Sequence, residues 1–255
     1  MRQLAASAAS ILLLDYDGTL APFQTERRQA YPYPPVIPIL ESILKCGRSR
    51  AVIITGRPVA EMGPLLSPLH NIEIWGSHGL EHLLANGTYR QTTIAPETAA
   101  LLSQAESLLI AAGLAHMTEI KPGGIAVHWR GLPDGEIEKV RSCAEKHLSD
   151  FSEQPELKLL TFEAGLELRV AHPNKGDAVT SILSGSEHKA QVAYLGDDLT
   201  DEDAFRVLNP HGFTVLVRPE YRATSARIWL RPPDELVSFL EQWLNSVSGG
   251  RQMRS

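Results

Sequence analysis

Short apolar runs alternate with amphipathic stretches along most of this 255-residue chain. Apolar runs bounded by Gly, Pro or polar turns predict short buried strands, and they cover residues 11–14, 51–55, 72–75, 191–195 and 213–217. Between them, apolar residues recur at helical spacing over residues 36–45, 58–66, 176–183 and 201–208. This alternation predicts an α/β core, a Rossmann-like parallel sheet with helices on both faces.

The middle of the chain has a different pattern. Helical spacing extends over residues 99–112 and 135–148, and strand-like segments cover residues 118–121, 125–129, 157–161 and 167–170. An open antiparallel sheet with two helices is α+β patterning, and here it interrupts an α/β chain. We therefore predict a core of residues 1–81 and 173–245, an inserted α+β cap of residues 82–172, and a loose tail at residues 246–255.

The composition is that of a globular protein, with 43% hydrophobic and 21% charged residues. The formal net charge is −6 and no basic block occurs, which argues against nucleic acid as a partner, because binding a polyanion needs clustered Lys and Arg. An anionic small molecule remains compatible, since a metal ion can reverse the sign of the charge inside one cleft. Cys46 and Cys143 are too few for a disulfide framework and predict reduced thiols.

The first fourteen residues superficially resemble a signal peptide, with Arg2, small residues and an apolar run at residues 11–14. That run is too short to span a membrane, and it leads directly into Asp15-Tyr16-Asp17. A strand that ends in functional carboxylates is the better interpretation. We expect no membrane segment and a cytoplasmic location.

Two carboxylates follow the first predicted strand. Ligands of open α/β sheets bind beyond the carboxyl ends of the strands, and residues two apart in an extended chain point the same way. Asp15 and Asp17 can therefore address one site. Two such charges repel unless a cation relieves them, and Mg²⁺ prefers oxygen ligands. The alternative is an ordinary Asp-Gly turn after a strand.

Further polar groups follow other strands. Residues 196–203 follow the strand at 191–195 and hold five acidic residues. Glu202 and Asp203 fit either a solvated face or a helix N-terminus, which attracts carboxylates, whereas Asp197 and Asp198 lie at a strand end, as Asp15 does. Thr55 ends another strand, and Lys175 lies at a predicted helix start, where backbone N–H groups favour phosphate.

In this order the residues resemble the motifs of the haloacid dehalogenase superfamily and, within it, of the trehalose-6-phosphate phosphatases. The phrases that carry the resemblance are LDYDGTL (14–20), ITGRP (54–58), GSHG (76–79), HWR (128–130), LELR (166–169), NKGDAV (174–179) and GDDLTDEDAF (196–205).

The resemblance implies a mechanism with named roles. Asp15 is the nucleophile that forms an aspartyl-phosphate, and Asp17 is the general acid and base. Thr55 and Lys175 hold the transferring oxygens. The implied cofactor is Mg²⁺, bound by Asp15, the Asp17 carbonyl and Asp197, with Asp198 and Asp201 in direct or water-mediated support.

The resemblance also implies a substrate, a small phosphorylated sugar, with trehalose 6-phosphate favoured, and a functional coupling to a trehalose-phosphate synthase. Within the cap, the family uses E-x-K and L-E-x-R segments to bind sugar hydroxyls, which here are Glu119, Lys121 and Glu167. The implied set also includes His128, Arg130, Arg57, His78 and Gly79. Alternatively, Glu119, Lys121 and Glu167 only cover the solvent face of the cap sheet.

Other functions remain open at this stage. A phosphatase for sucrose phosphate or for glucosyl- or mannosyl-3-phosphoglycerate keeps the fold and changes the substrate. A sugar phosphomutase changes the acceptor of the phosphate, and a regulatory module with a degenerate site has no reaction.

Overall fold

The computed structural model describes residues 7, 9–24, 26–162, 165–186 and 190–249 of the chain. These residues form two compact units, residues 1–90 with 174–255 and residues 91–173 by their outer limits. Below, the first is called the core unit and the second the cap unit.

The core unit is built on a sheet that has eight strands among the described residues. Their order across the sheet is β12 (Ile228–Leu230), β11 (Phe213–Val217), β10 (Gln191–Gly196), β1 (Ser10–Leu14), β2 (Ser49–Ile54), β3 (Glu73–Gly76), β4 (Glu81–Leu83) and β5 (Tyr89–Gln91). The pairs from β12 to β3 are parallel, and β4 pairs antiparallel with β3. The predicted parallel α/β core is confirmed.

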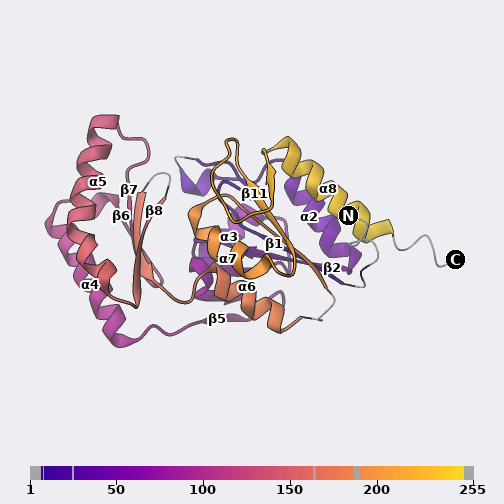
Figure 1. Ribbon diagram of the computed structural model, residues 1–255, viewed down its shortest axis with the longest axis horizontal. Coiled ribbons are helices and arrows are strands. Elements are labelled where there is room, and N and C mark those ends of the chain that lie inside the picture. Colours follow the sequence, from indigo (N-terminus) through magenta and orange to yellow (C-terminus); the bar gives the residue numbers. More distant parts are fainter. Residues whose placement is uncertain (1–6, 8, 25, 163–164, 187–189, 250–255) are drawn as a thin grey trace. The chain divides into compact units, whose positions relative to one another are not determined.

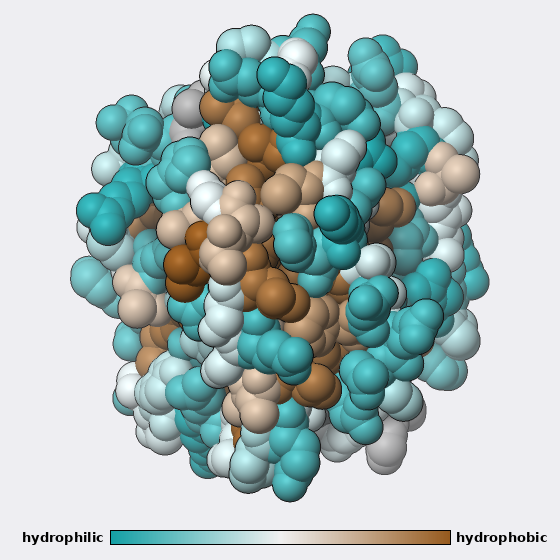
Figure 2. Space-filling view, turned by 90° about the vertical axis from the view of Figure 1, so that its left-hand side faces the viewer, coloured by the Kyte–Doolittle hydropathy of each residue, from teal (hydrophilic) through white to brown (hydrophobic). Residues whose placement is uncertain are grey.

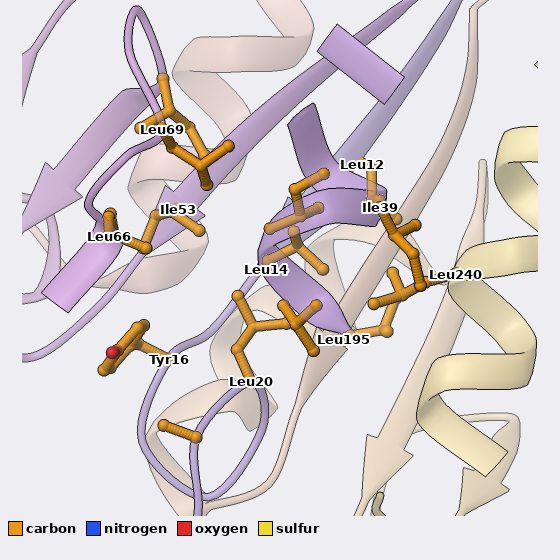
Figure 3. Close-up of a cluster of buried hydrophobic side chains, with 14 of the residues drawn as sticks. Leu12, Leu14, Tyr16, Leu20, Ile39, Ile53, Leu66, Leu69, Leu195 and Leu240 are labelled. Carbon is orange, nitrogen blue, oxygen red and sulfur yellow. The ribbon is translucent and has the colours of Figure 1, made fainter. Parts of the chain in front are cut away.

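Helices cover both faces of this sheet because its strands are apolar on both sides. Leu12 and Leu14 of β1 face one hydrophobic cluster with α2 (Val36–Cys46), α3 (Val59–Leu66) and α8 (Asp234–Ser248). Ile11 and Leu13 face the other, with α6 (Lys175–Ser184) and α7 (Glu202–Leu208). Figure 1 shows these helices around the strands, and Figure 3 shows the first cluster, in which Leu240 of α8 lies beside Ile39 and Leu12. Strand β1 is thus fixed from both sides just before Asp15.

The cap unit is a sheet of antiparallel strands backed by two helices. The strand order is β6 (Thr118–Lys121), β7 (Gly124–His128), β9 (Gly165–Val170) and β8 (Leu157–Phe162), and the helices are α4 (Pro96–Ala111) and α5 (Asp134–Leu148). On its helical side, seen in Figure 2, hydrophobic residues gather in a band bordered by hydrophilic ones. The predicted α+β cap pattern is confirmed.

Several predicted boundaries differ from the structure. The cap unit begins at residue 91 instead of 82, because β4 and β5 extend the core sheet. These strands and β12 have three residues each, too few for a periodic pattern. Helix α8 is absent from the predicted elements, and it includes Ser246 and Ser248 of the predicted tail, so that part of the prediction is wrong. Residues 250–255 of the tail lie outside the described residues.

Helix α8 should contribute strongly to core stability. Leu240 is fully buried in the first cluster, so Leu240→Ala removes packed methyl groups and leaves a cavity. We expect the free energy of unfolding to fall by about 2–5 kcal/mol, measured by urea denaturation. Glu241→Ala, at an exposed neighbouring position, is the control and should change it by no more than about 0.5 kcal/mol. Equal effects of the two substitutions would contradict the packing of α8.

Candidate active site in the core unit

The ends of neighbouring parallel strands bring the predicted site residues together. Asp15 follows β1, Asp197 follows β10 and Thr55 follows β2, and β1 pairs with both of the other strands. The backbone N–H of Asp15 donates to the carbonyl of Leu195 (2.9 Å), which continues the β1–β10 ladder to the residue that carries the first carboxylate.

Lys175 joins two carboxylates at the centre of the site. Its ammonium group donates to Oδ1 of Asp15 (2.6 Å) and to Oδ1 of Asp201 (2.7 Å), and all three residues are buried. The Asn174 capping box places Lys175 at the first position of α6. The other oxygen of Asp15 accepts a hydrogen bond from the Thr19 hydroxyl (3.1 Å). The predicted neighbourhood of Asp15 and Lys175 is present in the structure.

Asp201 organises the loop after β10. Besides Lys175, its Oδ1 accepts from the Tyr194 hydroxyl (2.6 Å), and its Oδ2 accepts from the backbone N–H groups of Asp197 (3.0 Å) and Asp198 (2.9 Å). Four donors occupy the lone pairs of this carboxylate. Asp201 would therefore bind a cation directly only by giving up one of these bonds.

The charges of the cluster fit a divalent cation. Carboxylate oxygens of Asp15, Asp197 and Asp201 lie within 4.8 Å of one another. Against these three charges stands the single ammonium of Lys175 in contact with two of them, which leaves an excess of two negative charges. The Oδ2 atom of Asp197 is buried and has no hydrogen-bond partner among the described residues. A hard cation with oxygen ligands would satisfy this atom and neutralise the excess.

Burial and the neighbouring charges together shift the pKa values in this cluster. Burial, opposed by the charge of Lys175, raises the pKa of Asp15 to about 7. Burial, together with the charges of Asp15 and Asp201, raises the pKa of Asp197 well above its usual range. Burial alone would lower the pKa of Lys175, but the two neighbouring carboxylates outweigh it and raise that pKa. Lys175 is therefore a fixed positive charge, whereas a further cation would favour the ionised forms of Asp15 and Asp197.

Gly18 allows close packing around this cluster. It has a φ of +78°, and a Cβ atom there would overlap the carboxylate of Asp197. The glycine of the Asp-Tyr-Asp-Gly-Thr segment therefore serves the site as well as the turn.

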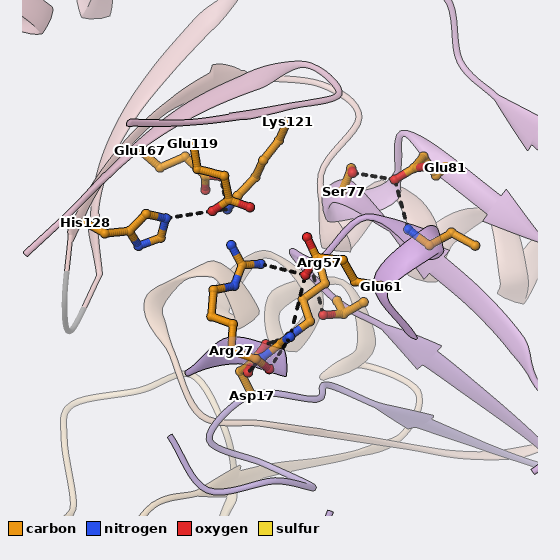
Figure 4. A network of polar contacts seen from close by, with 12 residues as sticks. Asp17, Arg27, Arg57, Glu61, Ser77, Glu81, Glu119, Lys121, His128 and Glu167 are labelled. Atoms are coloured by element: carbon orange, nitrogen blue, oxygen red, sulfur yellow. Dashed lines mark hydrogen bonds and ion pairs between the residues drawn. The ribbon is translucent and has the colours of Figure 1, made fainter. Parts of the chain in front are cut away.

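Asp17 is paired with Arg57 instead of joining the buried cluster. Arg57 donates from Nε to Oδ2 (2.6 Å) and from Nη2 to Oδ1 (2.6 Å) of Asp17, a bidentate ion pair. Figure 4 shows this pair beside Glu61 and Arg27, and the Arg27 carbonyl accepts from Nη1 of Arg57 (2.9 Å). Arg57, predicted to bind substrate, is buried and fully engaged by protein groups in this conformation.

Thr55 and His78 belong to two loops that hold each other. The Thr55 hydroxyl accepts from the Arg57 N–H (3.1 Å), and the Thr55 carbonyl accepts from the His78 N–H (3.0 Å). Glu81 joins the same loops, because its Oε2 accepts from the Ser77 hydroxyl (2.5 Å) and the Val59 N–H (3.2 Å). Figure 4 shows the hydrogen bond between Ser77 and Glu81.

Close packing also explains the glycines of these loops. Gly56 leaves room for the His78 ring, since a Cβ atom on Gly56 would lie 2.6 Å from it. Gly79 has a φ of +111°, and its Cα hydrogens face the Asn174 carbonyl just before Lys175.

The cap unit holds a separate polar cluster. Glu119 of β6 and Glu167 of β9 are both register partners of Ala126 on β7, so they project from the same face of the sheet. Lys121 donates to Glu167 (2.9 Å), and His128 lies 2.6 Å from Glu119 through Nε2. Arg130 lies half-buried beyond the end of β7. Below, the term cap quartet denotes the two pairs Lys121–Glu167 and His128–Glu119.

Some residues with clear roles in this geometry were not among the predicted site residues. Thr19 contacts Asp15, Tyr194 contacts Asp201, and Arg222 contacts the carbonyls of both Asp197 and Asp198. Glu202 lies in the first turn of α7, which agrees with the predicted helix N-terminus, but it is buried and paired with Arg222 (2.6 Å) instead of lying on a solvated face. Thr19 lies inside the Asp-Gly-Thr motif and could have been found there.

Comparison with known proteins agrees with the motifs. A family model described as trehalose-phosphatase matches residues 13–230. The trehalose-phosphate phosphatase of Mycobacterium tuberculosis is 28% identical over 246 residues, which cover 91% of this chain and 60% of that protein. Trehalose-phosphate phosphatase B of Arabidopsis thaliana is 27% identical over 262 residues, covering 94% and 68%. The chain thus spans about 60% of the length of the mycobacterial relatives that it matches.

A solved structure shows the same fold. The C-terminal domain of trehalose-6-phosphate phosphatase from C. albicans superposes with a TM-score of 0.82 at 20% identity, covering 97% of this chain and 94% of that one. A haloacid dehalogenase-like hydrolase from B. subtilis gives a TM-score of 0.65 at 14% identity, covering 91% and 99%. The core and cap units therefore have the haloacid dehalogenase type of fold. In the described part of the chain, every helix is too short or too polar to cross a membrane.

The central position of Asp201 can be tested by its stability effect. Asp201→Asn places an NH₂ group against donors, so we expect the free energy of unfolding to fall by about 1–3 kcal/mol. Asp203→Asn, two residues along and paired with the exposed Arg206, should cost about 1 kcal/mol or less. Denaturant unfolding of the metal-free chain measures both, and a cost for Asp201→Asn as small as that for Asp203→Asn would contradict the network.

Proposed function

Since this chain belongs to the trehalose-phosphatase family, we propose that it is a Mg²⁺-dependent phosphatase that hydrolyses trehalose 6-phosphate to trehalose and phosphate. The observation that carries the proposal is the buried cluster of Asp15, Asp197, Asp201 and Lys175, with its excess of two negative charges and the unpartnered Oδ2 of Asp197. A phosphatase of this type needs a nucleophilic carboxylate, a fixed positive charge and a cation at one strand edge, and each has a candidate here.

In the proposed reaction, an Asp15 oxygen attacks phosphorus, the bond from phosphorus to the sugar oxygen breaks, and Asp17 gives its proton to the departing oxygen. Asp17 then takes a proton from the water that releases phosphate and regenerates Asp15. Both oxygens of Asp17 are bonded to Arg57. The carboxyl must therefore turn away from Arg57 to carry a proton, which frees the guanidinium to bind a substrate oxygen.

The charged groups around Asp15 stabilise the transferring phosphoryl group. Lys175, held by two carboxylates, offsets negative charge on the phosphoryl oxygens, and the Thr55 hydroxyl donates to one of them. Mg²⁺ would be held by the carboxylates of Asp15 and Asp197 and the Asp17 carbonyl, and it would withdraw charge from the phosphoryl oxygens. Asp198 and Asp201 support this site indirectly, Asp201 because donors occupy its lone pairs.

The cap quartet is the proposed sugar-binding group. Carboxylates of Glu119 and Glu167 accept hydrogen bonds from sugar hydroxyls, and Lys121 and His128 donate or exchange partners with them. Their common face carries the small residues Gly124 and Ala126 between the charged side chains. Arg130, His78 and Gly79 are further candidates for substrate contact.

Two accompanying expectations stay predictions from the sequence. These are the functional coupling to a trehalose-phosphate synthase and the cytoplasmic location.

The first test is phosphate release from a panel of sugar phosphates, with and without Mg²⁺. We expect trehalose 6-phosphate to be hydrolysed only with a divalent cation, Ca²⁺ to inhibit, and Asp15→Asn to lose turnover by several orders of magnitude. Asp150→Asn, at an exposed position, should behave as the wild type. Activity that survives exhaustive chelation would contradict the dependence on a divalent cation. Faster phosphate release from sucrose phosphate or from glucosyl- or mannosyl-3-phosphoglycerate would contradict trehalose 6-phosphate as the substrate.

The second test concerns the cap quartet. We expect Glu119→Ala, Lys121→Ala and Glu167→Ala each to lower kcat/KM for trehalose 6-phosphate roughly ten- to hundredfold, because a hydrogen bond to a charged group contributes about 1.5–3 kcal/mol. Glucose 6-phosphate, which lacks the second ring, should be hydrolysed more slowly by the wild type and be less affected by the substitutions. The control is Glu136→Ala on the exposed surface of α5. Equal losses on both substrates would indicate a role in folding and not in recognition.

A further inference from the structure

The loop of residues 197–198 is held on both sides of its backbone. On one side, the N–H groups of Asp197 and Asp198 donate to Asp201. On the other, the carbonyl of Asp197 accepts from Nε of Arg222 (3.2 Å), and the carbonyl of Asp198 accepts from Nη2 (2.7 Å). Both peptide groups that flank the Asp197 side chain therefore have fixed orientations.

Arg222 comes from the connection between β11 and β12, and its own orientation is fixed. Its Nη1 donates to Glu202 (2.6 Å) and to the carbonyl of Ala223 (2.9 Å). Glu202 also accepts from the Thr224 hydroxyl (2.7 Å) and the Ser225 N–H (2.8 Å), both in the same connection. The rigid planar fork of the guanidinium thus bridges Glu202 and the two carbonyls.

These contacts of Arg222 oppose the electrostatic repulsion between neighbouring carboxylates. Carboxylate oxygens of Asp197, Asp15 and Asp201 lie within 4.8 Å of one another in a buried site, and like charges in low dielectric repel each other. A loop held only by Asp201 would relax away from Asp15. With Arg222 in place, the Asp197 carboxylate stays beside Asp15, with its Oδ2 available.

We propose that the Arg222–Glu202 ion pair is a positioning device that holds Asp197 for cation binding and so sets the affinity of the site for its divalent cation. The inference rests on the proposed function, because it takes the cluster of Asp15 and Asp197 as the cation site. Groups that hold metal ligands in place commonly change metal affinity by 10–100-fold when they are removed.

The charge of Arg222 alone predicts the opposite change in cation affinity, so the sign of the change tests the proposal. Arg222 is a positive charge close to a proposed cation site, so its removal should strengthen cation binding if charge were its main effect. Its removal also leaves the negative charge of Glu202 unpaired, which works in the same direction. In a folded variant, the positioning role predicts weaker binding, whereas the loss of charge predicts stronger binding.

The experiment is calorimetric titration of Mg²⁺ alone into the metal-free full chain. For Arg222→Met we expect the dissociation constant to rise about 10–100-fold, and for the pair Arg222→Met with Glu202→Gln a similar rise, although no charge is left unpaired. Arg222→Lys keeps the charge but loses the fork, and should recover affinity only in part. Arg227→Met is the control, since Arg227 is exposed in the same connection and its hydrogen bonds to Thr214 are made by its backbone.

A second measurement separates positioning from loss of fold. At saturating Mg²⁺, kcat of Arg222→Met should return to within a few-fold of the wild-type value, whereas a misfolded variant would stay inactive. Unchanged or tighter Mg²⁺ binding by Arg222→Met, with normal binding by the wild type, would overturn the positioning role alone. A wild type that binds no Mg²⁺ would overturn the cation site and with it the proposed function.

Discussion

The buried ammonium of Lys175 between Asp15 and Asp201 is the interaction on which the site depends. It ties the end of β1 to the start of α6 and to the turn that follows β10, three segments far apart in sequence. Burying charges is costly unless each finds partners, and here Thr19 and Tyr194 supply further donors to the two carboxylates. In Asp197, by contrast, the buried Oδ2 atom has no hydrogen-bond partner within the described part of the chain. A structural ion pair would leave no such oxygen without a partner, whereas a cation site needs one.

Two acidic residues beside the cluster are each paired with an arginine. Asp17 is matched by Arg57, and Glu202 is matched by Arg222. These pairs have no net charge. Their main contribution is to fix the orientation of the loops that carry them, because a guanidinium group that makes several hydrogen bonds holds its partners in a defined geometry. The fold therefore separates two tasks: neutral pairs hold the loops, and the charged cluster of Asp15, Lys175, Asp197 and Asp201 is left for the chemistry.

Strand-end carboxylates could be predicted from sequence because their position follows from local pattern alone. An apolar run that stops at Asp15, and another that stops just before Asp197, place both residues at the same edge of a parallel sheet. The partners of these residues could not be predicted in the same way. Arg222 lies in a polar connection without periodicity and acts on residues 24 and 25 positions earlier. Glu202 looks like any acidic helix start until the fold brings Arg222 to it. The short edge strands β4, β5 and β12 likewise depend on pairing with longer neighbours.

The cap quartet shows why specificity is harder to derive than chemistry. In the cap unit, Lys121 is bonded to Glu167, and Glu119 lies at hydrogen-bond distance from His128. In the proposed binding mode a sugar exchanges these contacts for its own, so each new hydrogen bond contributes only its net value over the bond that it replaces. A ligand that breaks a pair and satisfies only one partner leaves a half-buried charge unpaired, and that penalty exceeds the loss of a single contact. Selectivity then arises from how completely the hydroxyls of a ligand satisfy all four residues together. A ligand with few hydroxyls should bind more weakly than its size implies, because it breaks the hydrogen bonds of the quartet without replacing all of them.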